Sequence, residues 1–325
     1  MTNRTEKQAG LSEDPFVMTV GGPIAPAALG FTLPHEHVLV DFVGADQIGP
    51  GRYEIEEVLR AVLPFMVQVK GLGCQALVEC TPAYLGRDPV LLRQLSAQSG
   101  LALLTNTGYC GAAGDRFVPR HAYEESADQL CERWVREWEE GIDDTGVRPG
   151  FIKIGVDGSP LSEIDTKLVR AAARTHLRTG MAIAAHTAEG AAALQELGIL
   201  REEGVSGNAW IWVHAQLEQD RGIHVKAAAQ GAWLEFDGVA PQSIEEHLLL
   251  LADMKQGGLL GQVMVSHDAG WYCPGEADGG VFRGFDTMFT EFLPALRRAG
   301  FSEDEVRQLT VENPGKAFTI GARKR

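Results

Sequence analysis

The sequence predicts a (β/α)8 TIM barrel, in which eight parallel strands alternate with helices around a closed ring. Eight short apolar runs recur along the 325 residues, and longer segments with helical spacing of apolar residues lie between them. Near-continuous apolar strands are typical of a parallel sheet that is buried on both faces. No glycine-rich phosphate-binding motif follows any run, which disfavours a nucleotide-binding open sheet.

The composition argues against several classes of partner and site. Hydrophobic residues make up 45% of the chain and the formal net charge is −15, which fits a globular protein and disfavours nucleic acid or an anionic membrane as a partner. Five cysteines without a C-x-x-C pair argue against a disulfide framework and a cysteine zinc site. No signal-peptide pattern or membrane-length apolar run occurs, so we expect a cytoplasmic protein with a small-molecule substrate.

The N-terminal part of the chain precedes the repeating pattern. We expect residues 1–16 to be flexible and residues 17–325 to form a single barrel domain, because no linker or change in composition divides them. The segment from Val17 to Leu33 is rich in glycine, proline and alanine, which predicts a short hairpin or a cap over the barrel floor.

The strands and helices are then predicted in order. Between the strands, Ser162–Thr179 is a helix with Ser162 as its cap and Gly180 as its stop, Glu124–Glu140 is another, and Phe285–Phe318 supplies closing helices. The eight predicted strands are Phe31–Val40, Gln75–Cys80, Leu101–Thr107, Phe151–Val156, Met181–His186, Ala209–His214, Ala232–Asp237 and Gln262–Asp268.

Polar residues at the strand ends carry the chemistry, since barrel active sites form where the strands end. In the first run, His35 and His37 are two residues apart and share a strand face, so both can ligate one metal, while Glu36 is expected to point outward. The fifth and sixth runs end in His186 and His214. Each of these two histidines, taken alone, is explained equally well by a structural position in the core and by a metal site.

Two further strands complete this set. Lys153 stands between isoleucines in the fourth run, where burial favours the neutral, nucleophilic amine that captures CO₂ as a carbamate; pairing with Asp157, snorkelling, or a Schiff base remain alternatives. Asp268 ends the eighth run, where it can ligate a metal or accept a proton, and His267 is expected to be structural. This mixture of nitrogen and oxygen ligands suits zinc, and also manganese, iron or cobalt.

These motifs together resemble the phosphotriesterase-like branch of the amidohydrolase superfamily over about residues 17–320. The resemblance implies two divalent metals, with His35, His37 and Asp268 on the buried one and His186 and His214 on the exposed one. It implies that carboxylated Lys153 bridges them beside a hydroxide that attacks a carbonyl or phosphoryl centre, that Asp268 collects the proton, and that the protein is a homodimer. The matching segments are Leu33-Pro-His-Glu-His37, Ile152-Lys-Ile154, Ala185-His-Thr187, Val213-His214 and Ser266-His-Asp268.

Departures from the family pattern bear on the substrate. Leu217 and Gly238 stand where phosphotriesterases proper tend to place a carboxylate and a histidine, which argues against organophosphate hydrolysis. Tyr109 matches a tyrosine of lactonase members, although Gly238 replaces their arginine. We therefore expect a lactonase or esterase. Phosphotriester or N-acyl amide hydrolysis, a Schiff-base aldolase and a non-catalytic barrel binding protein are the alternatives.

Four residues are candidates for substrate binding. Tyr109 follows strand three and Asp237 ends strand seven, and Trp271 and Arg283 lie in the glycine-rich loop after strand eight, which is a candidate lid. Arg283 or Arg116 would suit a substrate carboxylate or phosphate, although exposed arginines are common without such a role. Glu79 and Cys110 are expected to be structural.

Overall fold

A ring of parallel strands forms the centre of the computed structural model, which describes residues 14–321. One run of neighbours is β3–β4–β5 and the other is β6–β7–β8–β9–β10–β11; only Thr105 separates β5 from β6, so the two make one position of the ring. The strands are β3 (Thr32–Leu39), β4 (Ala76–Glu79), β5 (Ala102–Leu104), β6 (Asn106–Thr107), β7 (Phe151–Gly155), β8 (Ala182–His186), β9 (Trp210–Val213), β10 (Trp233–Phe236) and β11 (Val263–Val265).

Backbone hydrogen bonds just beyond β11 close the ring against β3. The amide of Asp268 donates to the carbonyl of His35 at 3.1 Å, and the amide of His37 donates to the carbonyl of Ala269 at 2.8 Å. The strand β12 (Gly270–Tyr272) then continues beside β3 in parallel register. The predicted (β/α)8 barrel is therefore confirmed, and every predicted apolar run contains its strand.

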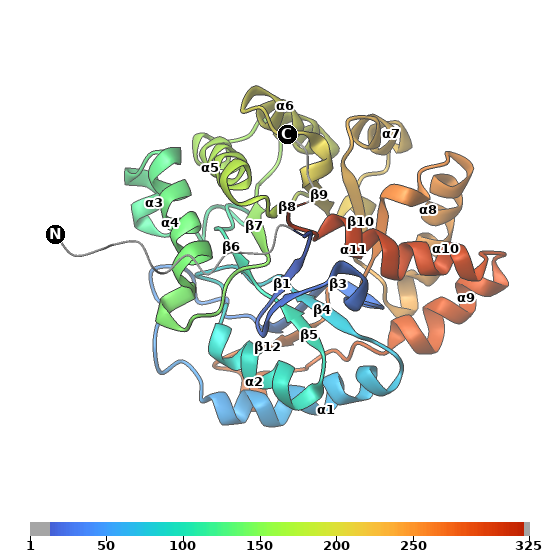
Figure 1. Cartoon of the computed structure of the whole chain (residues 1–325), viewed down its shortest axis with the longest axis horizontal. Coiled ribbons are helices and arrows are strands. Elements are labelled where there is room, and N and C mark those ends of the chain that lie inside the picture. Colours follow the sequence, from blue (N-terminus) through green and yellow to red (C-terminus); the bar gives the residue numbers. More distant parts are fainter. Residues whose placement is uncertain (1–13, 322–325) are drawn as a thin grey trace.

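Helices surround the ring on its outer side (Figure 1). They are α1 (Ile55–Gly71), α2 (Pro89–Ser99), α3 (Arg120–Glu124), α4 (Ala127–Glu140), α5 (Glu163–Thr179), α6 (Gly190–Glu202), α7 (Arg221–Ala229) and α8 (Ile244–Gln256), followed by the closing helices α9 (Leu293–Arg298), α10 (Glu303–Arg307) and α11 (Asn313–Ala317). The last three adjoin π-helical turns at Met288–Phe292 and Gln308–Glu312. None of the helices in residues 14–321 has the length and apolarity needed to cross a membrane.

Local sequence explains where these helices begin and end. As predicted, the hydroxyl of Ser162 caps α5 by accepting from the Asp165 amide, and Gly180 ends the helix at φ 74°. The prediction of one helix over Glu124–Glu140 was wrong at its start. Glu125 is extended, and Ser126 forms a capping box with Gln129, so α4 begins at Ala127.

A hairpin lies against the start of the strands, as the sequence predicted. It consists of β1 (Val17–Thr19) and β2 (Gly22–Ile24), which pair antiparallel. The amide of Val20 donates to the β5 residue Leu103 at 2.8 Å. Of the residues expected to be flexible, 1–13 lie outside the described residues, whereas Phe16 is buried and pairs through its backbone with Ile320.

Candidate metal centre

The six residues that the sequence singled out as metal ligands converge on one cavity of about 180 Å³. They come from β3, β7, β8 and the residues after β9 and β11, all at the carboxyl ends of the strands, because parallel strands present those ends on the same side. The residues are His35, His37, Lys153, His186, His214 and Asp268.

One group gathers where the ring closes. The Nε2 atoms of His35 and His37 lie 3.7 and 3.0 Å from Oδ1 of Asp268. The backbone of Asp268 has φ 52°, a left-handed conformation that turns the chain at this point. Ligand atoms of the three residues lie within 4.8 Å of one another, which suits a single metal ion.

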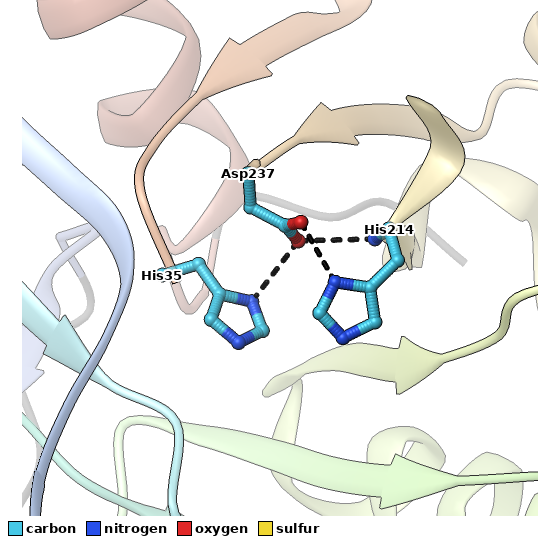
Figure 2. Close-up of side chains that lie close together, drawn as sticks. All are labelled: His35, His214 and Asp237. Carbon is cyan, nitrogen blue, oxygen red and sulfur yellow. Dashed lines mark hydrogen bonds and ion pairs between the residues drawn. The ribbon is translucent and has the colours of Figure 1, made fainter. Parts of the chain in front are cut away.

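Buried side chains contact the Nδ1 atoms of three of the candidate histidines. His35 Nδ1 lies 3.1 Å from Oε2 of Glu235, and His37 Nδ1 lies 2.8 Å from the Thr81 hydroxyl. Asp237 accepts at 2.7 Å from Nδ1 of His214 and lies 3.3 Å from Nδ1 of His35, as Figure 2 shows. With Nδ1 engaged in this way, Nε2 is left to face the cavity, as in most histidine metal sites.

A second pair of ligand atoms lies at the ends of β8 and β9. Nδ1 of His186 and Nε2 of His214 are 2.8 Å apart. Burial and the neighbouring imidazole of His214 lower the pKa of His186 well below its ordinary value, so this ring is neutral and has a lone pair to offer a metal. His214 itself has φ 66°, which places its ring over the strand ends.

Lys153 lies between these two groups on β7. Its side chain forms no hydrogen bond or ion pair with any residue in the described part of the chain, and only 4% of the residue is exposed, so it does not snorkel. Asp157 does not pair with it, because that carboxylate accepts from the amides of Ala113 and Gly114. The amine of Lys153 thus lines the cavity without a partner among the described residues, which leaves it available to a ligand.

The charges within the cluster are arranged for cation binding. Burial would raise the pKa of Asp268, but the hydrogen bond from His37 and the nearby His35 hold it well below its usual range. Burial also lowers the pKa of His35, with a further contribution from Lys153. Burial and the adjacent Asp237 raise the pKa of Glu235 well above its ordinary value. An ionised Asp268 beside the neutral imidazole of His35 fits a divalent metal.

Apolar side chains form the remaining walls of the cavity. Trp271, of the four residues proposed to bind substrate, is among them, and its ring lies edge-on to His37 with centroids 5.7 Å apart. No arginine lines this cavity within the described residues. The other wall residues include Val40, Phe42, Pro82, Leu85, Cys110, Ala112 and Phe117.

The other three substrate-binding candidates do not line this cavity within residues 14–321. Tyr109 faces the opposite side of its segment, and it is Cys110, expected to be structural, that faces the histidines. Asp237 is fully buried behind His214, where Gln216 also donates to it at 2.8 Å. Nη2 of Arg283 donates to the carbonyls of His267 and Asp268, so this side chain supports the turn that presents Asp268.

Two buried acids escaped the sequence reasoning. Glu36 does not line the cavity that His35 and His37 line, in keeping with its expected outward direction, but it is 0% exposed, and its carboxylate accepts from the Ser266 hydroxyl and from His267. His267 has a structural position as expected, since its Nε2 accepts from the Met288 amide at 2.9 Å. Glu235 lies in the apolar run Trp-Leu-Glu-Phe, where an acidic residue amid buried neighbours was the available signal.

Comparisons with known proteins identify relatives that match nearly the whole chain. The model of the Phosphotriesterase family matches residues 15–318. The "Phosphotriesterase homology protein" of Escherichia coli is 30% identical over 89% of this chain and 98% of its own length. The "Aryldialkylphosphatase" of Saccharolobus solfataricus is 26% identical over 90% of this chain and 95% of its own length. The "N-acetyltaurine hydrolase" of Tetraodon nigroviridis is 26% identical over 94% of this chain and 98% of its own length.

Proposed function

The chain belongs to the phosphotriesterase family, and from this premise we propose that it is a metal-dependent hydrolase of uncharged carboxylic esters or lactones. The family and the names of the relatives indicate a hydrolase. The observation that carries the finer proposal is the combination of a ligand cluster at the strand ends with apolar walls around it.

We assign the ligands as two groups. His35, His37 and Asp268 would hold one metal, and His186 and His214 would hold the other, with carboxylated Lys153 between them. A bound pair of divalent metals, most simply zinc, with manganese, iron or cobalt as alternatives, would polarise the scissile carbonyl and supply an activated water at neutral pH.

The chain's own residues orient the reactants and move the proton. Asp268 lies at the cavity with a carboxylate that stays ionised at neutral pH, so it can accept a proton as the ester is attacked. Glu235 and Asp237 fix the rings of His35 and His214, which keeps the ligand set preorganised. The apolar walls hold an acyl group and exclude bulk water.

The bond that is cleaved is the main alternative. Relatives named aryldialkylphosphatase and N-acetyltaurine hydrolase make phosphotriesters and N-acyl amides the second candidates. An anionic substrate would meet no arginine in the walls of this cavity in the described part of the chain, and the pocket is small at about 180 Å³. Both features favour a small, uncharged ester or lactone.

The test is hydrolysis of a matched panel of lactones, simple carboxylic esters, N-acyl amides and phosphotriesters. Metal-free and zinc-reconstituted protein are compared with bicarbonate present. Lys153→Ala is the inactive variant, and Lys226→Ala, at an exposed position on α7, is its control. We expect zinc to restore ester or lactone turnover in the wild type and in Lys226→Ala only.

Other outcomes would decide among the alternatives. Zinc-dependent turnover confined to amides or phosphotriesters would replace the ester assignment while keeping the metal centre. Metal binding without turnover of any class would favour a non-catalytic barrel that binds a small molecule. Failure of the wild type to bind metal would overturn the proposal.

A further inference from the structure

A second cavity, of about 620 Å³, lies beside the metal cavity. The residues that follow β3 and β4 line it together with the starts of α1 and α2, and Tyr109 and the α4 residue Glu137 close its inner side. It contains none of the proposed metal ligands. The proposed hydrolytic function gives this space no role.

A wall only one residue thick separates the two cavities. Leu39 and Asp41 line the second cavity, whereas the intervening Val40 lines the metal cavity. Tyr84 lines the second cavity and Leu85 lines the metal cavity, and both lie in the turn at residues 83–86. The Asp41 amide donates to the Leu85 carbonyl at 2.7 Å, which ties the two segments together.

Both arginines that line the second cavity form ion pairs with carboxylates. Nε and Nη2 of Arg52 both donate to the carboxylate of Asp41, at 2.6 and 2.9 Å. Arg87 donates through two nitrogens to Glu137, at 2.8 and 2.7 Å, and is itself almost fully buried. Both guanidinium groups are thus paired with carboxylates that line the same cavity.

Carboxylates remain in excess after these pairs are counted. The lining holds four carboxylates and two guanidinium groups, so its formal charge is −4 + 2 = −2. Asp88 accepts from the Tyr53 hydroxyl at 2.6 Å and from two backbone amides, with no cation paired to it among the described residues. Asp143 is exposed at the rim. The field in this cavity repels anions and attracts cations.

The lining of the second cavity also contains aromatic rings, which can contact a cation through their faces. Tyr53, Tyr84 and Tyr109 all line the cavity. The rings of Tyr84 and Tyr109 pack edge to face, with centroids 5.4 Å apart. Tyr84 takes φ 67°, a conformation that a tyrosine adopts only when its surroundings impose it. Tyrosine faces beside carboxylates are the surroundings that bind alkylated ammonium groups.

We propose that this second cavity binds a small organic cation, an ammonium group carrying alkyl substituents. The site is separate from the metal centre and does not depend on the proposed hydrolysis. The ligand would enter past Asp143, place its ammonium group among the tyrosines, and balance the excess negative charge of the lining.

Choline and 3,3-dimethylbutan-1-ol form the decisive pair of probes, because they have nearly the same shape and differ in charge. Each is titrated into the full-length protein, and binding is followed by ligand-observed NMR. We expect choline to bind about tenfold more tightly than the alcohol, and added salt to weaken only choline. Equal affinity for the two probes, or no binding of choline, would refute the proposal.

Variants locate the bound cation. Tyr84→Leu should weaken choline about tenfold, whereas Tyr123→Leu, at an exposed tyrosine outside the cavity, should not. Asp143→Asn replaces an exposed carboxylate at the rim and should also weaken choline, which keeps the test valid if Tyr84→Leu does not fold. Phe117→Leu alters the metal cavity and should leave binding unchanged. Loss of choline binding in Phe117→Leu alone would place the cation in the metal cavity and overturn the proposal.

Discussion

Replacing Glu36 by glutamine should destabilise the protein and loosen the turn that carries Asp268. The Glu36 carboxylate is 0% exposed. Its Oε1 accepts from the Ser266 hydroxyl at 2.8 Å and from the amide and Nδ1 of His267 at 3.1 and 2.6 Å. Its Oε2 accepts from the Ala269 amide at 2.9 Å. The residues on both sides of Asp268 are thus bound to a single side chain.

The size of the effect follows from these four bonds. An amide in place of the carboxylate can accept on one side only, so its NH₂ group would face the Ala269 amide and leave that donor unpaired, at a cost of about 1–3 kcal/mol. The three remaining bonds lose their charge assistance, about 1 kcal/mol each. A neutral amide is cheaper to bury than a carboxylate, which offsets part of this loss. We expect a net decrease of about 2–4 kcal/mol in the free energy of unfolding.

Urea denaturation would measure this change, with Glu139→Gln on the exposed face of α4 as the control. The midpoint should fall for Glu36→Gln while the dependence on urea stays constant. Zinc content per chain should fall in the same variant, because Asp268 would lose the fixed backbone that presents it. A Glu36→Gln protein within about 0.5 kcal/mol of the wild type would show that this carboxylate does not hold the turn.

Three further predictions follow from the same structure. Gly108→Ala would place a Cβ 2.1 Å from the Lys153 carbonyl oxygen at φ +115°, so the free energy of unfolding should fall by roughly 3 kcal/mol or more. Gly198→Ala, on α6 with open space around it, is the control and should not destabilise the protein. Equal effects in the two variants would contradict the packing argument. Burial raises the pKa of Glu196 from 4.5 to about 8. Between these pH values the folded state retains a proton that the unfolded chain releases, so the free energy of unfolding should fall as pH rises, by up to about 1.4 kcal/mol per pH unit. Urea unfolding of Glu196→Gln at several pH values should lack this slope, and an unchanged slope would rule out Glu196 as its source. Zinc at 100 times its dissociation constant should stabilise the wild type by about 2.7 kcal/mol in thermal unfolding. If Lys153→Ala is stabilised by zinc to the same extent, Lys153 is not part of the metal centre.

The sequence predicted the strands, and the gathering of the candidate ligand residues in one cavity, because both rest on local rules. Each apolar run contains its strand, and His35 and His37 share a face since strand side chains alternate. The same alternation explains why Cys110 rather than Tyr109 lines the metal cavity, because a shift of one residue moves a side chain to the other side of its segment.

Contacts between distant parts of the chain could not be predicted in this way. The direction of Glu36 follows from its own strand, but its partners lie after β11, and no local pattern indicates them. Arg283 was a candidate for substrate binding because loop arginines often bind anions, whereas its donors are taken by two backbone carbonyls. The second cavity also arises from segments whose proximity no local pattern encodes.

Closure of the ring against β3 has a consequence for how the protein is made. The His35 amide donates to the Ser266 hydroxyl across 231 positions of the chain. At about 5–20 residues per second, the ribosome needs roughly 10–50 s to deliver the second partner after the first. Until then one edge of β3 has unpaired amides and carbonyls that can pair with another nascent chain. A chaperone that shields this edge should raise the yield of folded protein, and a metal held by the proposed ligands could bind only after synthesis has passed Asp268.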